Sequence, residues 1–311
     1  MAIVSDANTR CGFVAVIGAP NAGKSTLVNA LVGSKVSIVT PKVQTTRMRV
    51  RGVAIRGETQ IVFVDTPGIF KPRRRLDRAM VNAAWAGAGE ADAILLLVDA
   101  PAVAAQGEGL AARDTQMIIE GLKKSNRRAA LVLNKVDDMP RADLLPLAER
   151  LNDPAVFEQV FMVSALSGDR VEDVANWTAA KMPVGPWLYP PDQAADIPMR
   201  LLAAEITREK LYLRLHDELP YATMVETEKW EERKDGSVKI DQVVTVERDG
   251  QKAIVLGKGG RAVKAIGEAA RKELEEMLGR RVHLFLFVKV RENWASAREH
   301  YAAIGLEYPE E

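Results

Sequence analysis

The chain has 311 residues, of which 47% are hydrophobic and 27% charged, and its net charge is +1. This length favours two domains, the composition excludes a largely disordered chain, and the near-neutral charge gives no global sign of a nucleic-acid partner. No apolar run approaches the ~20 residues that span a bilayer, and the one cysteine, Cys11, excludes a disulfide framework.

The first predicted strand leads into a phosphate-binding loop. Residues 13–17 (FVAVI) have the β-branched content of a buried strand, and residues 18–26 (GAPNAGKST) follow it with the pattern G-x-x-x-x-G-K-S. Glycines let the backbone N–H groups point at an anion, while Lys24 reaches the outer phosphates and Ser25 offers its hydroxyl to Mg²⁺. A helix predicted from about Lys24 to Val32 directs its positive end at the same phosphates. The predicted nucleotide-binding residues here are Gly18, Ala19, Pro20, Asn21, Ala22, Gly23, Lys24, Ser25 and Thr26.

A threonine-rich segment, residues 40–47 (TPKVQTTR), comes next and is predicted to contain a switch formed by Gln44, Thr45, Thr46 and Arg47. A switch needs a hydroxyl that engages Mg²⁺ only while the γ-phosphate is present. Thr46 is the first choice, although the residues themselves do not distinguish it from Thr45. The alternative interpretation is an ordinary threonine-rich entry to the next strand.

An antiparallel hairpin is predicted from residues 49–56, which alternate in polarity, turn at 57–59 and return at 60–64. The return strand ends in Asp65-Thr66-Pro67-Gly68. An aspartate beside a phosphate loop can hold Mg²⁺ through a water, and the Gly68 N–H can bond a γ-phosphate. The predicted metal set is therefore Ser25, Thr46 and Asp65, and the nucleotide-binding residues of this stretch are Asp65, Thr66, Pro67, Gly68 and Ile69.

The residue after Gly68 predicts slow intrinsic hydrolysis. Small regulatory GTPases place a water-orienting glutamine there, whereas this chain has Ile69. A K⁺ ion held by Asn21 near the β- and γ-phosphates is a candidate substitute. Basic clusters at Arg47, Arg49 and Arg51 and at residues 71–75 (KPRRR) are able to contact RNA or anionic lipid, but a solvated loop is the simpler interpretation.

Two further apolar runs, 93–98 and 129–133, are continuous and therefore typical of strands covered on both faces. Helical stretches such as 115–124 separate them, which predicts a mostly parallel sheet with ligands at the carboxyl ends of its strands. The second run ends in Asn134-Lys135-Val136-Asp137. A strand over 160–163 ends in Ser164-Ala165-Leu166, where a backbone N–H is placed to reach the guanine oxygen.

These last motifs predict selectivity for guanine. A carboxylate at Asp137 accepts both N1–H and the 2-amino group of guanine, whereas adenine leaves it unpaired, and such mismatches reject a wrong substrate by ~10⁴-fold. Lys135 lies along the base plane, and Asn134 ties its loop to the phosphate loop. The nucleotide-binding residues added here are Asn134, Lys135, Val136, Asp137, Ser164, Ala165 and Leu166. The four motifs in this order resemble the translation-factor-related GTPases, and a P-loop kinase or ATPase has no use for residues 134–137.

The domain boundaries are predicted from a stretch of the sequence that is dense in proline. Residues 1–182 form the GTP-binding domain, the proline-dense 183–198 an extended linker, and 199–311 a second domain. That domain is expected to contain a helix over 199–215, strands over 221–230 and 238–247, a G-x-x-G loop at 257–260, a helix from about Ala262 and a strand over 283–290.

The G-x-x-G loop predicts RNA binding, because paired glycines let a backbone phosphate of single-stranded nucleic acid approach closely. From Lys252 to Lys272 there are six Lys or Arg and one acidic residue, so the positive charge is concentrated there. An ordinary turn between two helices is the alternative interpretation. The predicted RNA-binding residues are Ile254, Val255, Gly257, Lys258, Gly259, Gly260, Arg261 and Lys264, with Ile254, Val255, Val263 and Ile266 as groove formers. The order of elements resembles an α+β type II KH domain.

A GTPase with Gln-Thr-Thr-Arg in its switch, Asp-Thr-Pro-Gly before a hydrophobic residue and a C-terminal KH domain resembles the Era family of bacterial ribosome-assembly GTPases. The resemblance spans nearly the whole chain and implies GTP or GDP and Mg²⁺ as ligands. It also implies binding to the 3′ end of small-subunit (16S) ribosomal RNA, maturation of the small (30S) subunit and partial attachment to the inner membrane face. An rRNA-binding assembly factor with a structural nucleotide is the alternative, and the KH domain disfavours a tRNA-modifying GTPase.

The expected location is the cytoplasm, with peripheral membrane contact at most. Residues 1–10 are polar and lack the basic-then-apolar order of a signal peptide. No transmembrane segment is predicted, and a monomer is expected.

Overall fold

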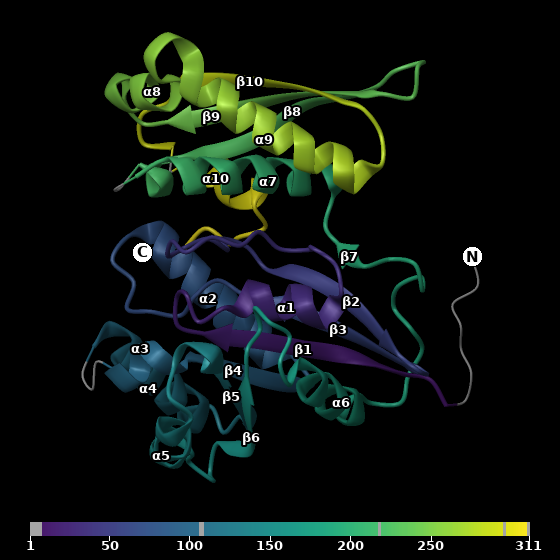
Figure 1. Cartoon of the computed structure of the whole chain (residues 1–311), viewed down its shortest axis with the longest axis vertical. Helices are drawn as coiled ribbons and strands as arrows, with labels where there is room; N and C mark the ends of the chain where they lie inside the picture. Colours follow the sequence, from purple (N-terminus) through teal and green to yellow (C-terminus); the bar gives the residue numbers. More distant parts are fainter. Residues whose placement is uncertain (1–7, 106–108, 217–218, 295–296, 310–311) are drawn as a thin grey trace. The chain divides into compact units, whose positions relative to one another are not determined.

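The computed structural model describes residues 8–105, 109–216, 219–294 and 297–309 (Figure 1). The chain divides into two compact units, Met1–Asp196 with Ile304–Glu311 and Ile197–Ala303. None of the helices in the described ranges combines the length and hydropathy that a bilayer crossing requires.

The first unit is an α/β domain around a mostly parallel sheet (Figure 1). Its strands are β1 (Arg10–Gly18), β2 (Val50–Arg56), β3 (Thr59–Asp65), β4 (Ala93–Asp99), β5 (Ala129–Asn134), β6 (Phe157–Val163) and β7 (Ala195–Asp196). Its helices and 3₁₀ turns are α1 (Lys24–Val32), α2 (Arg75–Glu90), α3 (Ala100–Ala105), α4 (Leu110–Lys124), η1 (Val136–Asp138), α5 (Arg141–Leu151) and α6 (Val171–Lys181). Within the described residues the strand order is β6-β5-β4-β1-β3-β2-β7. Strand β2 runs antiparallel to both of its neighbours, as the predicted hairpin requires.

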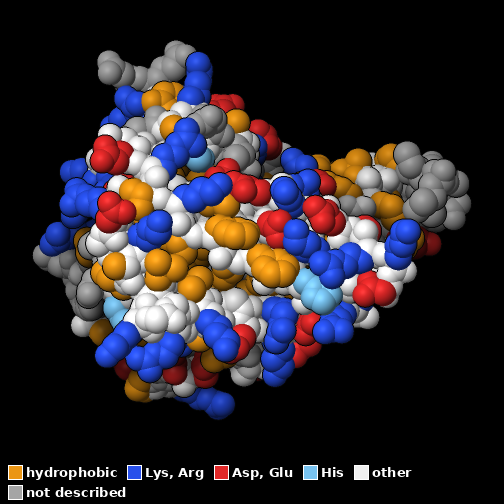
Figure 2. Space-filling model, turned by 90° about the horizontal axis from the view of Figure 1, so that it is seen from above, with side chains coloured by type: hydrophobic (Ala, Val, Ile, Leu, Met, Phe, Trp, Pro, Cys, Tyr) orange, Lys and Arg blue, Asp and Glu red, His pale blue; other side chains and the backbone are white. Residues whose placement is uncertain are grey.

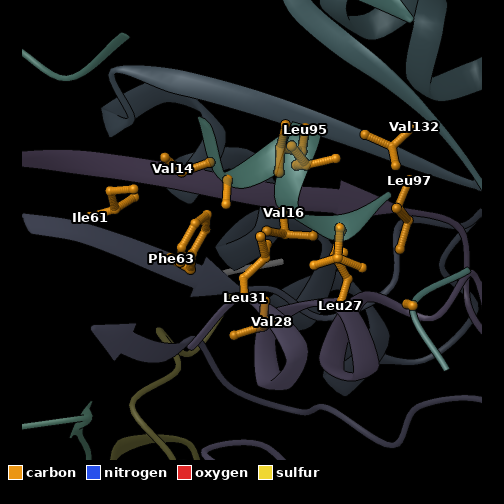
Figure 3. Close-up of a cluster of buried hydrophobic side chains, with 14 of the residues drawn as sticks. Val14, Val16, Leu27, Val28, Leu31, Ile61, Phe63, Leu95, Leu97 and Val132 are labelled. Carbon is orange, nitrogen blue, oxygen red and sulfur yellow. The ribbon is translucent and has the colours of Figure 1, made fainter. Parts of the chain in front are cut away.

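Both faces of this sheet are covered, which explains the uninterrupted apolar strands. Val14 and Val16 of β1 pack with Leu27 and Val28 of α1 on one face (Figure 3). Ala15 and Ile17 point to the opposite face, where α2, α3, α4 and α5 contribute the facing apolar side chains. Because successive side chains alternate across a strand, β1 is buried along most of its length, and its carboxyl end is held at the centre of the sheet.

The second unit has the arrangement predicted for a type II KH domain. Its elements are α7 (Met199–Arg214), η2 (Pro220–Ala222), β8 (Met224–Glu232), β9 (Val238–Val246), α8 (Asp249–Leu256), η3 (Lys258–Gly260), α9 (Arg261–Leu278), β10 (Val282–Val290) and α10 (Arg298–Ala303). In the described residues β9 lies between an antiparallel β8 and a parallel β10. Leu211 of α7, Val255 of α8 and Ile266 of α9 pack into one core with Val244 of β9.

Several boundaries differ from those predicted from sequence. The apolar run 253–256 is the end of α8, which begins at Asp249. The strand predicted from Tyr221 starts at Met224 because Pro220–Ala222 form a 3₁₀ turn. Strand β6 begins at Phe157, three residues earlier than its apolar core indicates.

The proline-dense segment is extended, and it is hydrogen-bonded to the first unit. The Cys11 N–H donates to the Pro183 carbonyl at 3.1 Å, and the side chain of Gln60 bonds the backbone of Leu188 and Tyr189 at 2.8–3.0 Å. Asp196 of β7 accepts from Arg51 of β2 at 3.0 Å. The unit boundary therefore falls after Asp196, whereas the sequence interpretation placed a separate linker over 183–198.

The last described residues also belong to the first unit rather than to the second domain expected over 199–311. The Arg75 guanidinium donates to the Tyr308 hydroxyl, and its central carbon lies 5.0 Å from the ring centroid of Tyr308. A cation placed over an aromatic face is attracted to it, so this pair fastens residues 304–309 to the start of α2.

Candidate functional site

The phosphate loop joins β1 to α1 and requires glycine at two positions for reasons internal to the protein. Gly18 and Gly23 have φ angles of 156° and 93°. A Cβ at Gly18 would lie 2.3 Å from the Leu97 carbonyl oxygen, and one at Gly23 would lie 2.3 Å from Asn134 Nδ2. Neighbouring strand ends therefore press against the loop and fix its path.

Lys24 opens α1 with its ammonium group folded against the same loop. Nζ donates to the carbonyls of Gly18 at 3.1 Å and Ala19 at 2.9 Å, and the residue is only 6% exposed. Burial lowers the pKa of Lys24 to about 8, and the nearby Asp65 carboxylate partly opposes that shift. A buried ammonium with only carbonyl partners is poised to gain from an anionic ligand.

Three oxygens converge beside Lys24. Ser25 Oγ lies 2.7 Å from Asp65 Oδ2 and 2.8 Å from Thr46 Oγ1, and the Thr46 hydroxyl donates to Asp65 Oδ2 at 3.3 Å. Asp65 is fully buried, and burial raises its pKa despite the hydrogen bond from Ser25 and the charge of Lys24. Its Oδ1 has no hydrogen-bond partner among the described residues.

This oxygen triangle fits Mg²⁺. Octahedral Mg²⁺ has ligands at about 2.1 Å, which places adjacent ligand oxygens about 3 Å apart. A buried carboxylate with an unpaired oxygen is a site that a cation stabilises. No cluster of three or more His, Cys, Asp or Glu in the described residues offers an alternative metal site. Ser25, Thr46 and Asp65, the predicted metal set, are therefore brought together.

The two switch threonines have different partners, which the sequence left open. Thr45 Oγ1 bonds the Thr40 hydroxyl at 2.6 Å and the Lys42 carbonyl at 2.7 Å, so its hydroxyl is used within the switch segment. Thr46 alone reaches Ser25 and Asp65. Gln44 Nε2 donates to Asp77 Oδ1 of α2 at 3.1 Å, and Arg47 is buried.

The loops at the carboxyl ends of the strands surround a cavity of about 510 Å³. Among the predicted residues, those that line it are Pro20, Asn21, Gly23, Lys24, Ser25, Thr26, Gln44, Thr45, Thr46, Gly68, Asn134, Lys135, Asp137, Ser164, Ala165 and Leu166. A volume of this size suits a nucleotide-sized ligand. The phosphate loop, the switch and the predicted base-recognition motifs thus face one space.

Other predicted nucleotide residues lie behind this wall: Gly18, Ala19, Ala22, Asp65, Thr66, Pro67, Ile69, Val136 and the switch residue Arg47 do not line the cavity. Thr66 is buried and donates to the Val16 carbonyl at 2.8 Å. Ile69 is also fully buried, in the core between the sheet and α2, and its N–H donates to the Gly18 carbonyl at 3.0 Å. Its side chain is a packing residue, so no group at this position faces the phosphates.

The base-recognition loops are connected through Asn134. Its Nδ2 donates to the Ala22 carbonyl at 2.8 Å, and its Oδ1 accepts the Ala165 N–H at 2.9 Å. The bond to Ala22 is the tie to the phosphate loop that the sequence predicts, and the bond from Ala165 additionally connects the 164–166 loop. Asp137 is exposed in the cavity wall, so its carboxylate is accessible to a base.

The sequence reasoning missed Asp99, Asp138, Ile38 and Val39, all of which line the cavity. Asp99 Oδ2 accepts from Lys135 Nζ at 2.5 Å, which fixes the lysine along the cavity wall. The signal for Asp99 was present, because it directly follows the apolar run 93–98 just as Asp65 follows its own strand. Ile38 and Val39 lie in irregular structure before the threonine-rich segment and have no comparable pattern.

The G-x-x-G loop of the second unit connects α8 to α9. Gly257, Gly259 and Gly260 have φ angles of 69°, 62° and 75°. A Cβ at Gly257 would lie 2.6 Å from that of Ala262, whereas a Cβ at Gly259 or Gly260 would have no neighbour within 4 Å. Lys258 is exposed beside them. The loop therefore presents open backbone next to a cation.

Only some of the predicted groove residues are accessible. Ile254 is 59% exposed, but Val255 and Ile266 are at most 1% exposed and belong to the core of the unit, so their side chains have no surface for a base. Lys264 is exposed, Val263 is half-buried, and the Arg261 guanidinium donates to the Lys258 carbonyl at 3.2 Å. Figure 2 looks onto the side that carries β10 and α8 in Figure 1 and shows hydrophobic side chains gathered among Lys and Arg.

Comparison with known proteins agrees with both units. Residues 13–135 match the family described as "50S ribosome-binding GTPase", and residues 218–295 match "KH domain". The chain is 63% identical to GTPase Era of Rhizobium meliloti (strain 1021), covering 97% of this chain and 94% of that protein. It is 61% identical to GTPase Era of Caulobacter vibrioides (strain NA1000 / CB15N), covering 96% and 97%.

Solved structures extend the likeness to the fold of both units. A crystal structure of Era in complex with MgGDPNP and nucleotides 1506–1542 of 16S ribosomal RNA matches with a TM-score of 0.88 and 38% identity, covering 96% of this chain and 99% of that one. A crystal structure of a point variant of Aquifex aeolicus Era bound to GDP.AlF4⁻ matches with a TM-score of 0.87 and the same identity and coverage.

Proposed function

The chain belongs to the Era family of GTPases, and we propose that it couples GTP binding and hydrolysis to binding of the 3′ end of 16S ribosomal RNA during maturation of the small ribosomal subunit. As a family member it is a GTP hydrolase that uses GTP, GDP and Mg²⁺. The observation that carries the proposal is that one chain holds both a cavity lined by the predicted guanine-nucleotide motifs and an exposed G-x-x-G loop.

In the proposed complex, the loop from Gly18 to Ser25 holds the phosphates, and Lys24 moves its ammonium from two backbone carbonyls to phosphate oxygens. Ser25 and Thr46 would hold Mg²⁺ through their hydroxyls and Asp65 through a water, and the ion when bound neutralises charge on the β- and γ-phosphates. Asp137 accepts the guanine edge, and Lys135, fixed by Asp99, covers the base plane.

Hydrolysis is expected to be slow without assistance, because Ile69 is locked in the core and cannot orient water. We propose that K⁺ held by Asn21, which lines the cavity with a left-handed φ of 64°, offsets developing phosphate charge. Turnover measured in KCl and in NaCl at equal ionic strength tests this. Faster turnover in KCl is expected for the wild type and not for Asn21→Ala, and equal rates in both salts would contradict the proposal.

The switch proposal assigns Mg²⁺ to Thr46 rather than Thr45, on the contacts of the two hydroxyls. Thr46→Ala should weaken binding of a non-hydrolysable GTP analogue about tenfold while leaving GDP binding nearly unchanged, as expected for the loss of one charge-assisted contact. Thr45→Ala is the matched control and should change neither affinity. Equal effects of the two substitutions would contradict the assignment.

The coupling is tested by RNA affinity in the two nucleotide states. A 16S RNA fragment of nucleotides 1506–1542, the one bound in the related structure, should bind more tightly with the GTP analogue than with GDP. Identical affinities would favour the alternative function, an rRNA-binding assembly factor in which the nucleotide is structural, because no coupling free energy would exist.

We further propose that the protein acts as a monomer in the cytoplasm, with part of it at the inner membrane face. Exposed basic side chains are the kind that anionic lipid headgroups attract. Fractionation of cells in low and high salt tests the location. A salt-released fraction in the membrane pellet is expected, and its absence at low salt would contradict membrane contact.

A further inference from the structure

The segment that follows the cavity-lining residue Gly68 in the sequence is strongly basic. Residues 71–78 (KPRRRLDR) contain five basic residues and one acidic residue. Lys71, Arg73, Arg74 and Arg78 are exposed, and we call these four the basic cluster. No ion pair in the described ranges involves any of them, whereas Arg75 is engaged by Tyr308.

The one carboxylate within the segment is already committed. Asp77 is 5% exposed, and its Oδ2 accepts the backbone N–H groups of Arg73 and Arg74 at 3.1 and 3.0 Å. Its Oδ1 accepts from Gln44. Four neighbouring cations without acidic partners repel one another and destabilise the fold. The presence of these four residues is therefore not explained by a contribution to stability.

We propose that the basic cluster is a second RNA-contact surface, which grips the phosphate backbone of the RNA that the G-x-x-G loop is proposed to bind. The inference therefore rests on the proposed function. Three of the four residues are arginine, whose planar guanidinium pairs with phosphate oxygens in a bidentate way. Contacts of this kind add affinity and position without reading sequence.

A membrane is the less favoured occupant. A polybasic segment anchors stably to lipid only with a second, apolar signal. Among the described residues, the large hydrophobic side chains that are exposed include none from 66–90, and Leu76 within the segment is half-buried. The surface therefore offers positive charge but no apolar side chain that could insert into a bilayer. Such a surface suits the phosphate backbone of RNA better than a membrane.

The position of the cluster links it to the catalytic centre. Gly68, three residues before Lys71, lines the cavity. Through Asp77, the first turn of α2 is hydrogen-bonded to Gln44 of the switch, two residues from Thr46. RNA bound by the basic cluster is therefore expected to affect the position of the switch, which carries the Thr46 hydroxyl. The rate of GTP hydrolysis should change as a result.

The test neutralises the cluster in the full-length protein. The variant Lys71→Gln, Arg73→Gln, Arg74→Gln, Arg78→Gln is compared with a control that neutralises four exposed basic residues elsewhere in the same unit, Lys123→Gln, Lys124→Gln, Arg141→Gln and Arg170→Gln. Binding of the 16S fragment 1506–1542 with the GTP analogue is measured over a range of salt, together with GTP affinity as a check on folding.

The cluster variant should bind this RNA at least tenfold more weakly than the control, and the slope of log affinity against log salt should fall by about 3, since each lost phosphate contact removes about 0.7–0.9. RNA-stimulated turnover should fall in parallel while GTP affinity is unchanged. If the RNA affinity and the salt slope equal those of the control, this inference is wrong, whereas the proposed function is unaffected.

Two further outcomes are decisive. If the cluster variant loses binding to phosphatidylglycerol vesicles but keeps its RNA affinity, the occupant is lipid and the inference is wrong. If the wild-type protein itself fails to bind the RNA, the proposed function fails together with the inference. Lys258→Ala, at the G-x-x-G loop, provides the reference for loss of RNA binding at the other surface.

Discussion

The two glycine loops of this protein look alike in sequence and are built on opposite principles. At Gly18 and Gly23, a Cβ would collide with atoms of the protein itself at 2.3 Å. A Cβ added at Gly259 or Gly260 would have no neighbour within 4 Å, and at these two positions only the left-handed φ angles favour glycine. The phosphate loop is therefore shaped from inside by its neighbours, whereas the G-x-x-G loop has such an internal contact only at Gly257 and keeps the space beside Gly259 and Gly260 free for a ligand.

The lysines of the two loops differ in the same way. Lys24 is buried and bonded to two carbonyls, so its side chain is already ordered within the loop before any ligand arrives. Lys258 is exposed. A preorganised site loses its conformational entropy during folding, while an open loop loses it on binding. We therefore expect substitutions in the first region to have larger and more uniform effects than those in the second.

The largest expected effect tests Asp137, an exposed recognition group of the first region. Asp137→Asn should weaken GTP binding about 10³-fold, because the amide cannot accept both guanine donors. The same variant should bind xanthosine triphosphate more tightly than GTP. Competition between the two nucleotides measures this, with Asp138→Asn as the neighbouring control. Retained discrimination against xanthosine triphosphate would show that Asp137 does not contact the base.

The second test is the collision at Gly18. Gly18→Ala should lower GTP affinity about 10²-fold, because the new methyl group forces the loop away from the Leu97 carbonyl. Gly33→Ala is a useful control, since Gly33 also has a positive φ, 78°, but has open space around it. Similar losses for both variants would mean that φ strain, not internal contact, shapes the phosphate loop.

The features that could be predicted from the sequence are those that depend on local pattern, and the features that could not are those that depend on tertiary contacts. Motifs at strand ends predicted most of the cavity, because a strand period and a following turn residue are local signals. The choice between Thr45 and Thr46 depends on which hydroxyl reaches Ser25 across the chain, and local pattern contains no such information. Val255 and Ile266 were predicted as groove residues, yet tertiary packing buries them.

The role of β7 and of the last residues was not predictable for a similar reason. Proline density indicates extended chain but not where that chain lies. Gln60, which holds the backbone of Leu188 and Tyr189, is an ordinary glutamine in a strand sequence. Arg75 and Tyr308 are more than two hundred residues apart, so their contact appears only in the folded chain.

The third prediction uses the buried lysine. With a pKa of about 8, Lys24 is charged in the free protein below pH 8 and becomes neutral above it. The bound triphosphate favours the charged form, so above pH 8 binding must take up a proton, and affinity falls as pH rises. From pH 7 to pH 9 the GTP affinity should fall about tenfold.

The control for this pH dependence is Lys24→Arg, which stays charged throughout the range. It should show no comparable decline, whatever its affinity at pH 7. A wild-type affinity that is as flat as that of the arginine variant would mean that Lys24 is not desolvated before the nucleotide binds.

The smallest expected effect lies in the second region. Gly259→Ala places a residue with a Cβ at φ 62°, which costs about 1 kcal/mol without any internal collision. RNA affinity should therefore fall at most about fivefold, because strain that the free loop relieves appears only in binding, whereas strain present in both the free and the bound loop lowers only the free energy of unfolding, by up to ~1 kcal/mol. Fluorescence anisotropy with the 16S fragment and urea unfolding measure the two. A loss of RNA affinity far beyond fivefold, at unchanged stability, would show that RNA backbone occupies the space beside Gly259 at van der Waals distance. The bound RNA would then exclude a Cβ at this position, as neighbouring protein atoms do in the phosphate loop.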